Sequence, residues 1–343
     1  MKAIKIIQSG SKQAAELQDV PLPTLRDDYV LCKVTCVALN PTDWKHIDGD
    51  GGIPGSGVGS DMRGVIEEVG TNVSNDWKKG DRIAAFVHGG NDTHPEDGTE
   101  TYTLGFEGIS DEDAASLGVG VTTCGQALYQ SLRLPLPGSC EHHGKPLLVY
   151  GGSTGTGMLA IQYAKLSGYT VIATASSRNW PLLKFLGADE VFDYKDPDCA
   201  SKIRSWTNDK CTLALDCISE GSSPNICEEA LSSQGGTITY LLKSAMESNT
   251  RTDIELKHTS GYTAFGEAFD KLGAHVPAKE GDLEHARMFW RLTQRLLQEG
   301  RLKPAPVRVG GEGLVGVFGG MQEMRDGRLS GEKLVYRVGE TPT

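Results

Sequence analysis

The chain has 343 residues and a formal net charge of −11, from 34 basic and 45 acidic side chains. This charge excludes the basic surface that binds nucleic acid, and no apolar run approaches the roughly 18 residues of a membrane span, so neither partner is expected. The eight cysteines form no C-x-x-C pair and residues 1–7 are too short for a signal peptide, so we expect free thiols in a reducing compartment, the cytoplasm.

Residues 1 to about 130 are expected to be mostly β structure. Strands are predicted at 3–7, 29–39, 64–69 and 82–87, and turn residues separate them. Glycines also cluster between residues 49 and 59. This pattern is typical of a compact, turn-rich β domain.

A glycine-rich stretch follows, between two apolar runs at 147–150 and 171–175. It places Gly151, Gly152, Gly155 and Gly157 directly before a segment with helical spacing. A β-strand, a glycine turn and a helix N-terminus together bind the pyrophosphate of a dinucleotide. The expected contacts in this turn are Ser153, Thr154, Gly155 and Thr156. The alternative is a tight turn between strand and helix that binds no ligand.

From residue 131 to 270 helices and strands alternate, which predicts a doubly wound parallel sheet. Helices are expected at 180–186, 199–206 and 224–232, and strands at 190–194, 212–217 and 237–242. Ligands bind at the carboxyl ends of such strands, so Tyr194, Leu241 and Leu242 are candidate cofactor contacts. A helix at 284–298, another at 315–325 and a strand at 333–338 would complete the first domain. The expected domains are therefore 1–130, 131–270 and 271–343.

The tip after the second strand of the sheet reads Ser176, Ser177, Arg178 and Asn179. A site that prefers NAD usually carries an acidic residue here for the ribose 2′-hydroxyl. Small hydroxyls with an arginine suit a 2′-phosphate instead, because the guanidinium donates several hydrogen bonds in a fixed fork. The tip therefore predicts NADPH, and the alternative is a polar loop that contains an arginine by chance.

Several segments resemble the medium-chain dehydrogenase/reductase superfamily: Val65-Ile-Glu-Glu-Val-Gly70, Gly80-Asp-Arg82 and the glycine turn at 150–157. Within it, the chain is most similar to the fungal trans-acting enoyl reductases of polyketide synthesis, of the lovastatin enoyl reductase type. That resemblance rests on segments spread along the chain, at 40–45, 172–179, 191–194, 264–267 and 329–335.

The resemblance implies an α/β protein with a GroES-like β domain and a Rossmann domain. It implies that hydride passes from NADPH to the β-carbon of a polyketide enoyl thioester, held on the acyl carrier domain of a separate highly reducing polyketide synthase. The α-carbon is then protonated, with solvent water as the expected proton source. A monomer is expected.

Zinc-dependent relatives hold a catalytic metal with cysteine and histidine. Here Asn40 stands at the first ligand position, and Ser60-Asp61 replaces a His-Glu pair. No metal is therefore expected, which disfavours alcohol dehydrogenation.

The resemblance also implies the remaining site residues. Lys45 follows a turn that faces the nicotinamide, so it is the expected catalytic residue, with a plain surface lysine as the alternative. Further cofactor contacts are expected at Thr42, Asp43, Trp44, Gly331 and Glu332. Two segments are expected to face the substrate, although both could be structural turns: Gly118, Val119, Gly120, Val121, Thr122, Thr123, Cys124 and Gly125, and Thr259, Ser260, Gly261, Tyr262 and Thr263.

Two other functions remain open. The chain could be a stand-alone NADPH reductase of quinones or small enones, which would share every cofactor residue. It could also be a catalytically silent NADPH-binding module. The second idea rests on a segment near Leu104 and Phe106 that is shorter than in the family.

Overall fold

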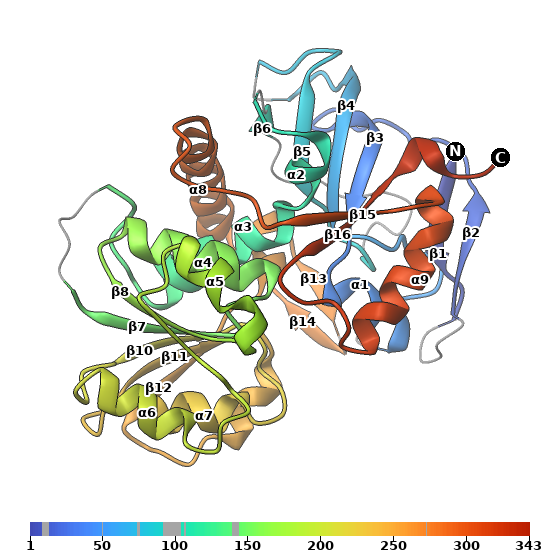
Figure 1. Cartoon of the computed structure of the whole chain (residues 1–343). Coiled ribbons are helices and arrows are strands. Elements are labelled where there is room, and N and C mark those ends of the chain that lie inside the picture. The colour runs from blue at the N-terminus through green and yellow to red at the C-terminus, as the bar shows by residue number, and fades with distance from the viewer. Residues whose placement is uncertain are drawn as a thin grey trace. The chain divides into compact units, whose positions relative to one another are not determined.

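The computed structural model describes residues 1–8, 14–49, 51–73, 76–91, 104–105, 108–138, 144–271 and 273–343 (Figure 1). The chain divides into two compact units. Unit 1 comprises residues 1–122, 262–299 and 304–343, and unit 2 comprises residues 123–261 and 300–303. The functional domain limits expected from the sequence stay a prediction.

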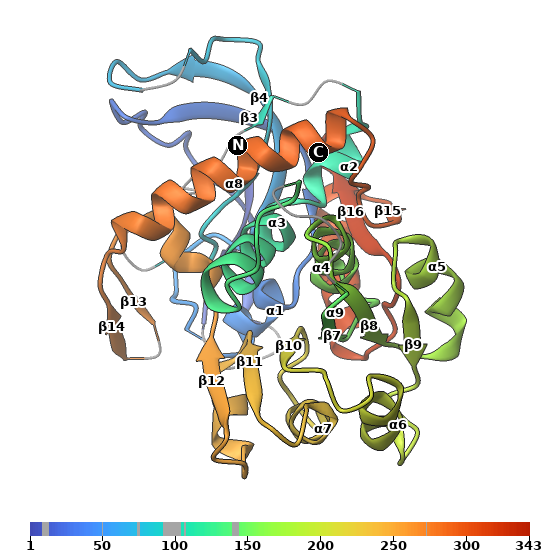
Figure 2. The same ribbon diagram turned by 90° about the vertical axis from the view of Figure 1, so that its left-hand side faces the viewer.

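Unit 2 contains a six-stranded parallel sheet among its described residues, with strand order β12-β11-β10-β7-β8-β9. The strands are β7 (Pro146–Tyr150), β8 (Thr170–Thr174), β9 (Glu190–Phe192), β10 (Leu213–Asp216), β11 (Gly236–Tyr240) and β12 (Ile254–His258). The helices α4 (Gly155–Leu166) and α5 (Trp180–Phe185) cover one face. The other face is covered by α6 (Cys199–Trp206) and α7 (Ser223–Ala230) (Figure 1; Figure 2). The predicted doubly wound sheet is therefore confirmed.

The interior strands β7 and β8 are buried almost throughout because helices cover both faces of the sheet. Their side chains pack with those of β10, β11 and the facing helices. Part of this core consists of Leu148, Tyr150, Ile172, Ile203, Ala214, Ile238 and Tyr240. The edge strand β12 was not predicted, since its Ile-Glu-Leu-Lys-His sequence alternates in polarity and lacks the continuous apolar run of a central strand.

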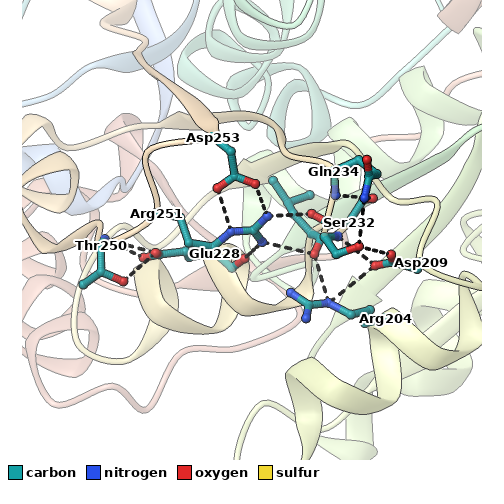
Figure 3. Close-up of polar contacts among 10 residues, drawn as sticks. Arg204, Asp209, Glu228, Ser232, Gln234, Thr250, Arg251 and Asp253 are labelled. Atoms are coloured by element: carbon teal, nitrogen blue, oxygen red, sulfur yellow. Dashed lines mark hydrogen bonds and ion pairs between the residues drawn. The ribbon is translucent and has the colours of Figure 1, made fainter.

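Arg251 ties the end of α7 to the start of β12 (Figure 3). Its guanidinium donates to the carbonyl oxygens of Glu228 at 3.0 Å and Ser232 at 2.7 Å, and it pairs with the Asp253 carboxylate at 2.5 Å. The last carbonyls of a helix have no partner within the helix, so an arginine fork that reaches them acts as a cap. The Arg251 side chain therefore caps the C-terminal end of α7 and holds the start of the edge strand β12 beside it.

Unit 1 contains a mixed sheet of order β15-β16-β3-β4-β5-β6. These strands are β3 (Val30–Ala38), β4 (Asp61–Val69), β5 (Arg82–Phe86), β6 (Leu104–Gly105), β15 (Val307–Gly310) and β16 (Lys333–Arg337). Two antiparallel pairs accompany it, β1 (Lys2–Ile6) with β2 (Ala15–Asp19) and β13 (Phe269–Lys271) with β14 (Ala274–Val276). Because β16 pairs antiparallel with β3, the C-terminal segment completes the sheet begun by the N-terminal segment, as expected from the sequence.

Unit 1 also contains helices, which lie between or after its strands. They are α1 (Pro41–Asp48), α2 (Asp111–Ala115), α8 (Glu280–Gln298) and α9 (Gly313–Arg325), while α3 (Gly118–Cys124) begins in unit 1 and ends in unit 2. The apolar side chains of α8 point inward, and Trp290 donates to the Thr122 hydroxyl at 3.0 Å. Across the described residues, no helix is long and apolar enough to cross a membrane.

The segment read from the sequence as a turn at residues 40–43 is in fact the start of α1. Asn40 is extended, with φ −131° and ψ 155°, and Pro41 occupies the first helical turn, where its missing N–H costs no hydrogen bond. The Asp43 carboxylate accepts the Asn40 N–H at 2.7 Å, which is one half of a capping box. Gly49, with φ 115°, ends the helix.

The shortened segment before α2 falls largely outside the described residues, which omit 92–103 and 106–107. Within the described part, β6 pairs with β5. The prediction that this segment lacks a strand found in the family is therefore not tested here.

Candidate active site

The glycine turn of unit 2 has the local geometry of a phosphate cradle. Thr154 caps α4, and its hydroxyl accepts the Gly157 N–H at 2.9 Å. A Cβ on Gly157 would lie 2.3 Å from the Gly151 carbonyl oxygen, so this position requires glycine. The N–H groups of Gly155 and Thr156 make no hydrogen bond within the described chain. These groups, at the positive end of the α4 dipole, fit a pyrophosphate.

This turn also lies where the order of the sheet reverses. The chain builds β7, β8 and β9 in one direction and then returns to place β10 beside β7. Dinucleotides bind at such a switch point, outside the carboxyl ends of the strands. At the end of β10 the buried Asp216 carboxylate accepts N–H groups of Ile218 at 2.9 Å and Ser219 at 2.8 Å. Burial raises the pKa of Asp216 above its ordinary value, and the hydrogen bonds from the Ser223 hydroxyl and from these N–H groups offset only part of this rise.

The tip after β8 carries the side chains proposed for a 2′-phosphate. Ser177 and Arg178 are exposed, and Ser176 is half-buried. Arg178 forms no ion pair with any residue that the structure describes, so its guanidinium is available to an anion. Asn179, in contrast, is 8% exposed and faces the interior.

The other candidate contacts of unit 2 follow strands of the same sheet. Tyr194 follows β9 and is 38% exposed, and its ring lies 6.4 Å from that of Tyr150. Leu241 and Leu242 follow β11 and are half-buried. Because the strands are parallel, these residues lie at the same edge as the glycine turn. Their role as cofactor contacts stays a prediction.

In unit 1, α1 presents the residues expected near the nicotinamide. Thr42, Trp44 and Lys45 are half-buried, and the Lys45 ammonium lies 5.6 Å from the centroid of the Trp44 ring. Arg325 lies over the same ring at 5.6 Å and pairs with Asp48 at 2.9 Å. Lys45 therefore lies on a helix that Arg325 holds through an ion pair with Asp48 and a contact with the Trp44 ring.

A buried ammonium contacts Asn40 and Asp61, two of the positions that the sequence analysis compared with the metal ligands of zinc-dependent enzymes. Lys333 donates to the Asn40 side-chain oxygen at 2.7 Å, the Leu39 carbonyl at 2.9 Å and the Asp61 carboxylate at 2.9 Å. The Lys333 side chain is 8% exposed and that of Asp61 is 0% exposed. The described residues contain no group of three or more histidine, cysteine or acidic side chains placed to hold a metal.

Asp43 belongs to this buried network. Its carboxylate accepts the Ser60 hydroxyl at 2.8 Å, in addition to the Asn40 N–H. Burial raises the pKa of the Asp43 carboxyl from 3.8 to about 7, against the effect of the two hydrogen bonds. The side chain is 1% exposed, so its predicted contact with a cofactor stays a prediction.

The raised pKa of Asp43 predicts a pH dependence of stability. Between the unfolded pKa of 3.8 and the folded pKa of about 7, the folded protein holds a proton that the unfolded chain releases. The free energy of unfolding should therefore fall as pH rises through this window, by about 1 kcal/mol per pH unit. Urea unfolding of the wild type and of Asp43→Asn, measured from pH 5 to pH 8, checks this. The difference between the two should shrink at low pH, and parallel curves would contradict it.

A second polar cluster in unit 1 contains residues that the sequence analysis missed. Tyr262 bonds to the Thr42 hydroxyl, and the His46 Nε2 atom lies 3.2 Å from Thr42 and 3.1 Å from the Lys271 ammonium. His88 stacks on the Tyr262 ring with centroids 4.5 Å apart. The spacing from Thr42 to His46 could have indicated a shared helix face if residues 41–48 had been read as a helix.

The two segments expected to face the substrate, residues 118–125 and 259–263, make different contacts. On α3, the Val119 N–H donates to Asp61 at 2.6 Å, and the Thr122 hydroxyl accepts from Trp290. Cys124 is fully buried in unit 2, and burial raises the pKa of its thiol well above 9.0. Thr123 and Gly125 are buried beside it.

In the second segment, the Thr259 hydroxyl bonds to Ser131 at 2.8 Å and to Thr239 at 2.9 Å inside unit 2. Tyr262 and Thr263 belong to unit 1. Of the remaining cofactor candidates, Glu332 is paired with Arg308 at 2.8 Å, next to Gly331, whose φ is 78°. Contacts of all these residues with substrate or cofactor stay predictions.

Comparison with known proteins identifies the family. The Alcohol dehydrogenase GroES-like domain matches residues 26–133, and the Zinc-binding dehydrogenase domain matches residues 155–259. The chain is 46% identical to the trans-enoyl reductase ACTTS2 of Alternaria alternata, over 97% of this chain and 98% of that protein. It is 42% identical to the trans-enoyl reductase resD of Aspergillus sclerotiorum, over 97% and 99%. The chain belongs to the trans-enoyl reductases.

Solved structures agree with this trans-enoyl reductase assignment at the level of the fold. The CurK enoyl reductase superposes with a TM-score of 0.78 at 18% identity and covers 98% of each chain. A quinone oxidoreductase from Coxiella burnetii superposes with a TM-score of 0.74 at 26% identity, over 98% of this chain and 99% of that one. The predicted combination of a GroES-like and a Rossmann domain is confirmed, and this trans-enoyl reductase is an oxidoreductase with the fold of nicotinamide-dependent enzymes.

Proposed function

We propose that this protein is a trans-acting enoyl reductase that uses NADPH to saturate the α,β-double bond of a polyketide enoyl thioester. The observation that carries the proposal is the similarity, over nearly the full length, to proteins named trans-enoyl reductases. The structure adds support for the cofactor: a glycine turn that fits a pyrophosphate, and an exposed arginine tip with no acidic residue.

When bound, NADPH supplies the hydride that adds to the β-carbon. The residues of this chain bind and orient it. The N–H groups of Gly155 and Thr156 would hold the pyrophosphate, and Arg178 with Ser176 and Ser177 would hold the 2′-phosphate. Lys45, on helix α1, would stabilise the negative charge that develops on the thioester oxygen after hydride addition.

The proposed substrate is carried by the acyl carrier domain of a separate highly reducing polyketide synthase. The names of the relatives support this, because a trans-acting enoyl reductase acts on a substrate that another protein holds. We propose that the enzyme works as a monomer.

The test measures NADPH oxidation with a 2-enoyl thioester of pantetheine, beside a simple quinone. A quinone is included because a quinone oxidoreductase shares the fold. Turnover of the thioester, with formation of the saturated product, is the expected result. Turnover of the quinone alone would instead favour the stand-alone reductase, and tight NADPH binding without turnover of either would favour a silent module.

The role of Lys45 gives a further prediction. Replacing Lys45 with alanine should lower kcat for the enoyl thioester by about 100-fold, the usual loss when one group that stabilises an oxyanion is removed. The dissociation constant of NADPH should change little. The matched control is Lys33→Ala, since Lys33 is an exposed lysine on β3 of the same unit and should leave kcat unchanged. Equal kcat values in the Lys45 variant and the wild type would remove this role.

A further inference from the structure

One cluster in unit 1 has no role in the function proposed so far. We call it the tyrosine cluster: Thr42 and His46 on α1, His88 after β5, Tyr262 at the start of a 3₁₀ segment (Gly261–Phe265), and Lys271 on β13. These side chains come from four separate stretches of the chain and meet at the Tyr262 hydroxyl and ring. Sequence reasoning had placed Tyr262 and Thr42 at the site, without a chemical role for the tyrosine.

The Tyr262 hydroxyl is held on two sides. It shares a hydrogen bond with the Thr42 hydroxyl, and it lies 3.4 Å from His46 Nε2. The tyrosine ring is packed between aromatic neighbours, with its centroid 5.6 Å from that of Phe86 and 4.5 Å from that of His88. Tyr262 is 8% exposed, while Thr42 is only half-buried. Thr42 is therefore the more accessible end of this pair of hydroxyls.

The positive charge of the cluster is that of Lys271. Burial lowers the pKa of His46 well below 6.5 and that of His88 to about 3, and the charge of Lys271 contributes to both shifts. Both imidazoles are therefore neutral at physiological pH. The Lys271 ammonium lies 3.1 Å from His46 Nε2, which must accept this hydrogen bond, and 4.2 Å from the centroid of the Tyr262 ring. A positive charge at this distance can stabilise negative charge on the Tyr262 side chain.

We propose that Tyr262 supplies the proton that reaches the α-carbon, through the hydroxyl of Thr42 and with Lys271 stabilising the tyrosinate that remains. This inference rests on the proposed function, since it assigns a proton source to the same reduction. It replaces solvent water, which the sequence analysis had expected, as the immediate source. Tyr262 and Lys271 act through Thr42 and are therefore positioning residues in this scheme.

Hydride addition to the β-carbon moves the electron pair of the double bond toward the thioester carbonyl, which forms an enolate. The enolate α-carbon takes the proton of the Thr42 hydroxyl, and Thr42 takes the proton of Tyr262. A proton then returns to the tyrosinate through His46 Nε2, which lies 3.1 Å from the Lys271 ammonium and 3.4 Å from the Tyr262 hydroxyl: His46 takes a proton from Lys271 and gives it to Tyr262, and water protonates the Lys271 amine. The half-buried position of Lys271 gives water access to this last step.

The experiment compares the wild type with Tyr262→Phe on a 2-methyl-2-enoyl pantetheine thioester. We expect kcat to fall by about 100-fold, the range for loss of a positioned acid, while NADPH affinity and the unfolding midpoint change little. The decisive readout is the configuration at the α-carbon. The wild type should form one configuration, and Tyr262→Phe should form both, because water can protonate the enolate from either face.

Two further variants separate this role from a structural one. Lys271→Met should also lower kcat and mix the configurations, and Lys271→Arg should restore much of both. Tyr29→Phe is the matched control, because it removes a tyrosine hydroxyl of the same unit that bonds to Glu267 at 3.1 Å. A Tyr262→Phe enzyme with wild-type kcat and a single configuration would overturn the proposal. A wild type that does not reduce the thioester would overturn the proposed function as well.

Discussion

Replacing Lys333 with methionine is expected to lower the free energy of unfolding of unit 1 by about 3–5 kcal/mol. The Lys333 ammonium is buried and makes three hydrogen bonds, one of them to the fully buried Asp61 carboxylate. Methionine fills similar space but leaves that carboxylate without its positive partner in a medium that solvates charge poorly. Urea unfolding followed by circular dichroism measures the loss.

Two control variants identify what causes the loss of stability in Lys333→Met. Lys79→Met removes an exposed lysine of the same unit, whose side chain is 75% exposed and lies 3.4 Å from Glu67, and it should not shift the unfolding midpoint. The double variant Lys333→Met with Asp61→Asn removes both buried charges and should regain part of the lost stability. A double variant no more stable than Lys333→Met would show that packing of the lysine stem, and not the unpaired charge, accounts for the loss.

Replacing Arg178 with alanine is expected to lower kcat/KM for NADPH by roughly 30- to 100-fold. The guanidinium is exposed at the end of β8 and has no partner within the described residues, so the variant should lose the bonds to the 2′-phosphate and little else. Hydrogen bonds to charged groups contribute about 2–3 kcal/mol, and every 1.4 kcal/mol is tenfold. The rate with NADH, which lacks that phosphate, should stay almost unchanged.

A second lysine variant is the control for the comparison of NADPH with NADH. Lys184→Ala removes an exposed lysine of α5 in the same unit that pairs with Glu190 at 3.0 Å, and it should leave both coenzymes unaffected. Equal losses with NADPH and NADH in Arg178→Ala would indicate that the arginine supports the shape of the tip. A wild type that prefers NADH would contradict the assignment of NADPH itself.

Most elements of unit 2 could be predicted from the sequence because its strands are buried on both faces and its helices bury one face. The resulting patterns are strong: α6 was predicted at 199–206 and lies at Cys199–Trp206. The edge strand β12 was missed because its alternating polarity resembles a surface loop. In unit 1, α1 was missed because the Asn-Pro-Thr-Asp start has the composition of a turn, and only eight residues of helix follow it.

The candidate site could be predicted only in part, because some of its residues are far apart in the sequence. Residues that act through local chain geometry, such as Gly157 and the tip at Arg178, are visible as short patterns. The tyrosine cluster joins residues 42, 46, 88, 262 and 271, which no local pattern connects. Lys333 was read as the first residue of a strand, and its burial against Asp61 depends on the pairing of β16 with β3, which forms only in the folded sheet.

The burial of cysteine side chains, described above for Cys124, has a consequence for the proposed substrate. An α,β-unsaturated thioester is an electrophile, and a thiolate adds readily to its β-carbon, the same atom that receives the hydride. Only the ionised thiol reacts in this way. Burial raises the pKa of Cys124 and Cys227 well above the ordinary value of 9.0, so these side chains remain protonated at physiological pH. The fold thereby protects these cysteines of the enzyme from alkylation by the compound it reduces.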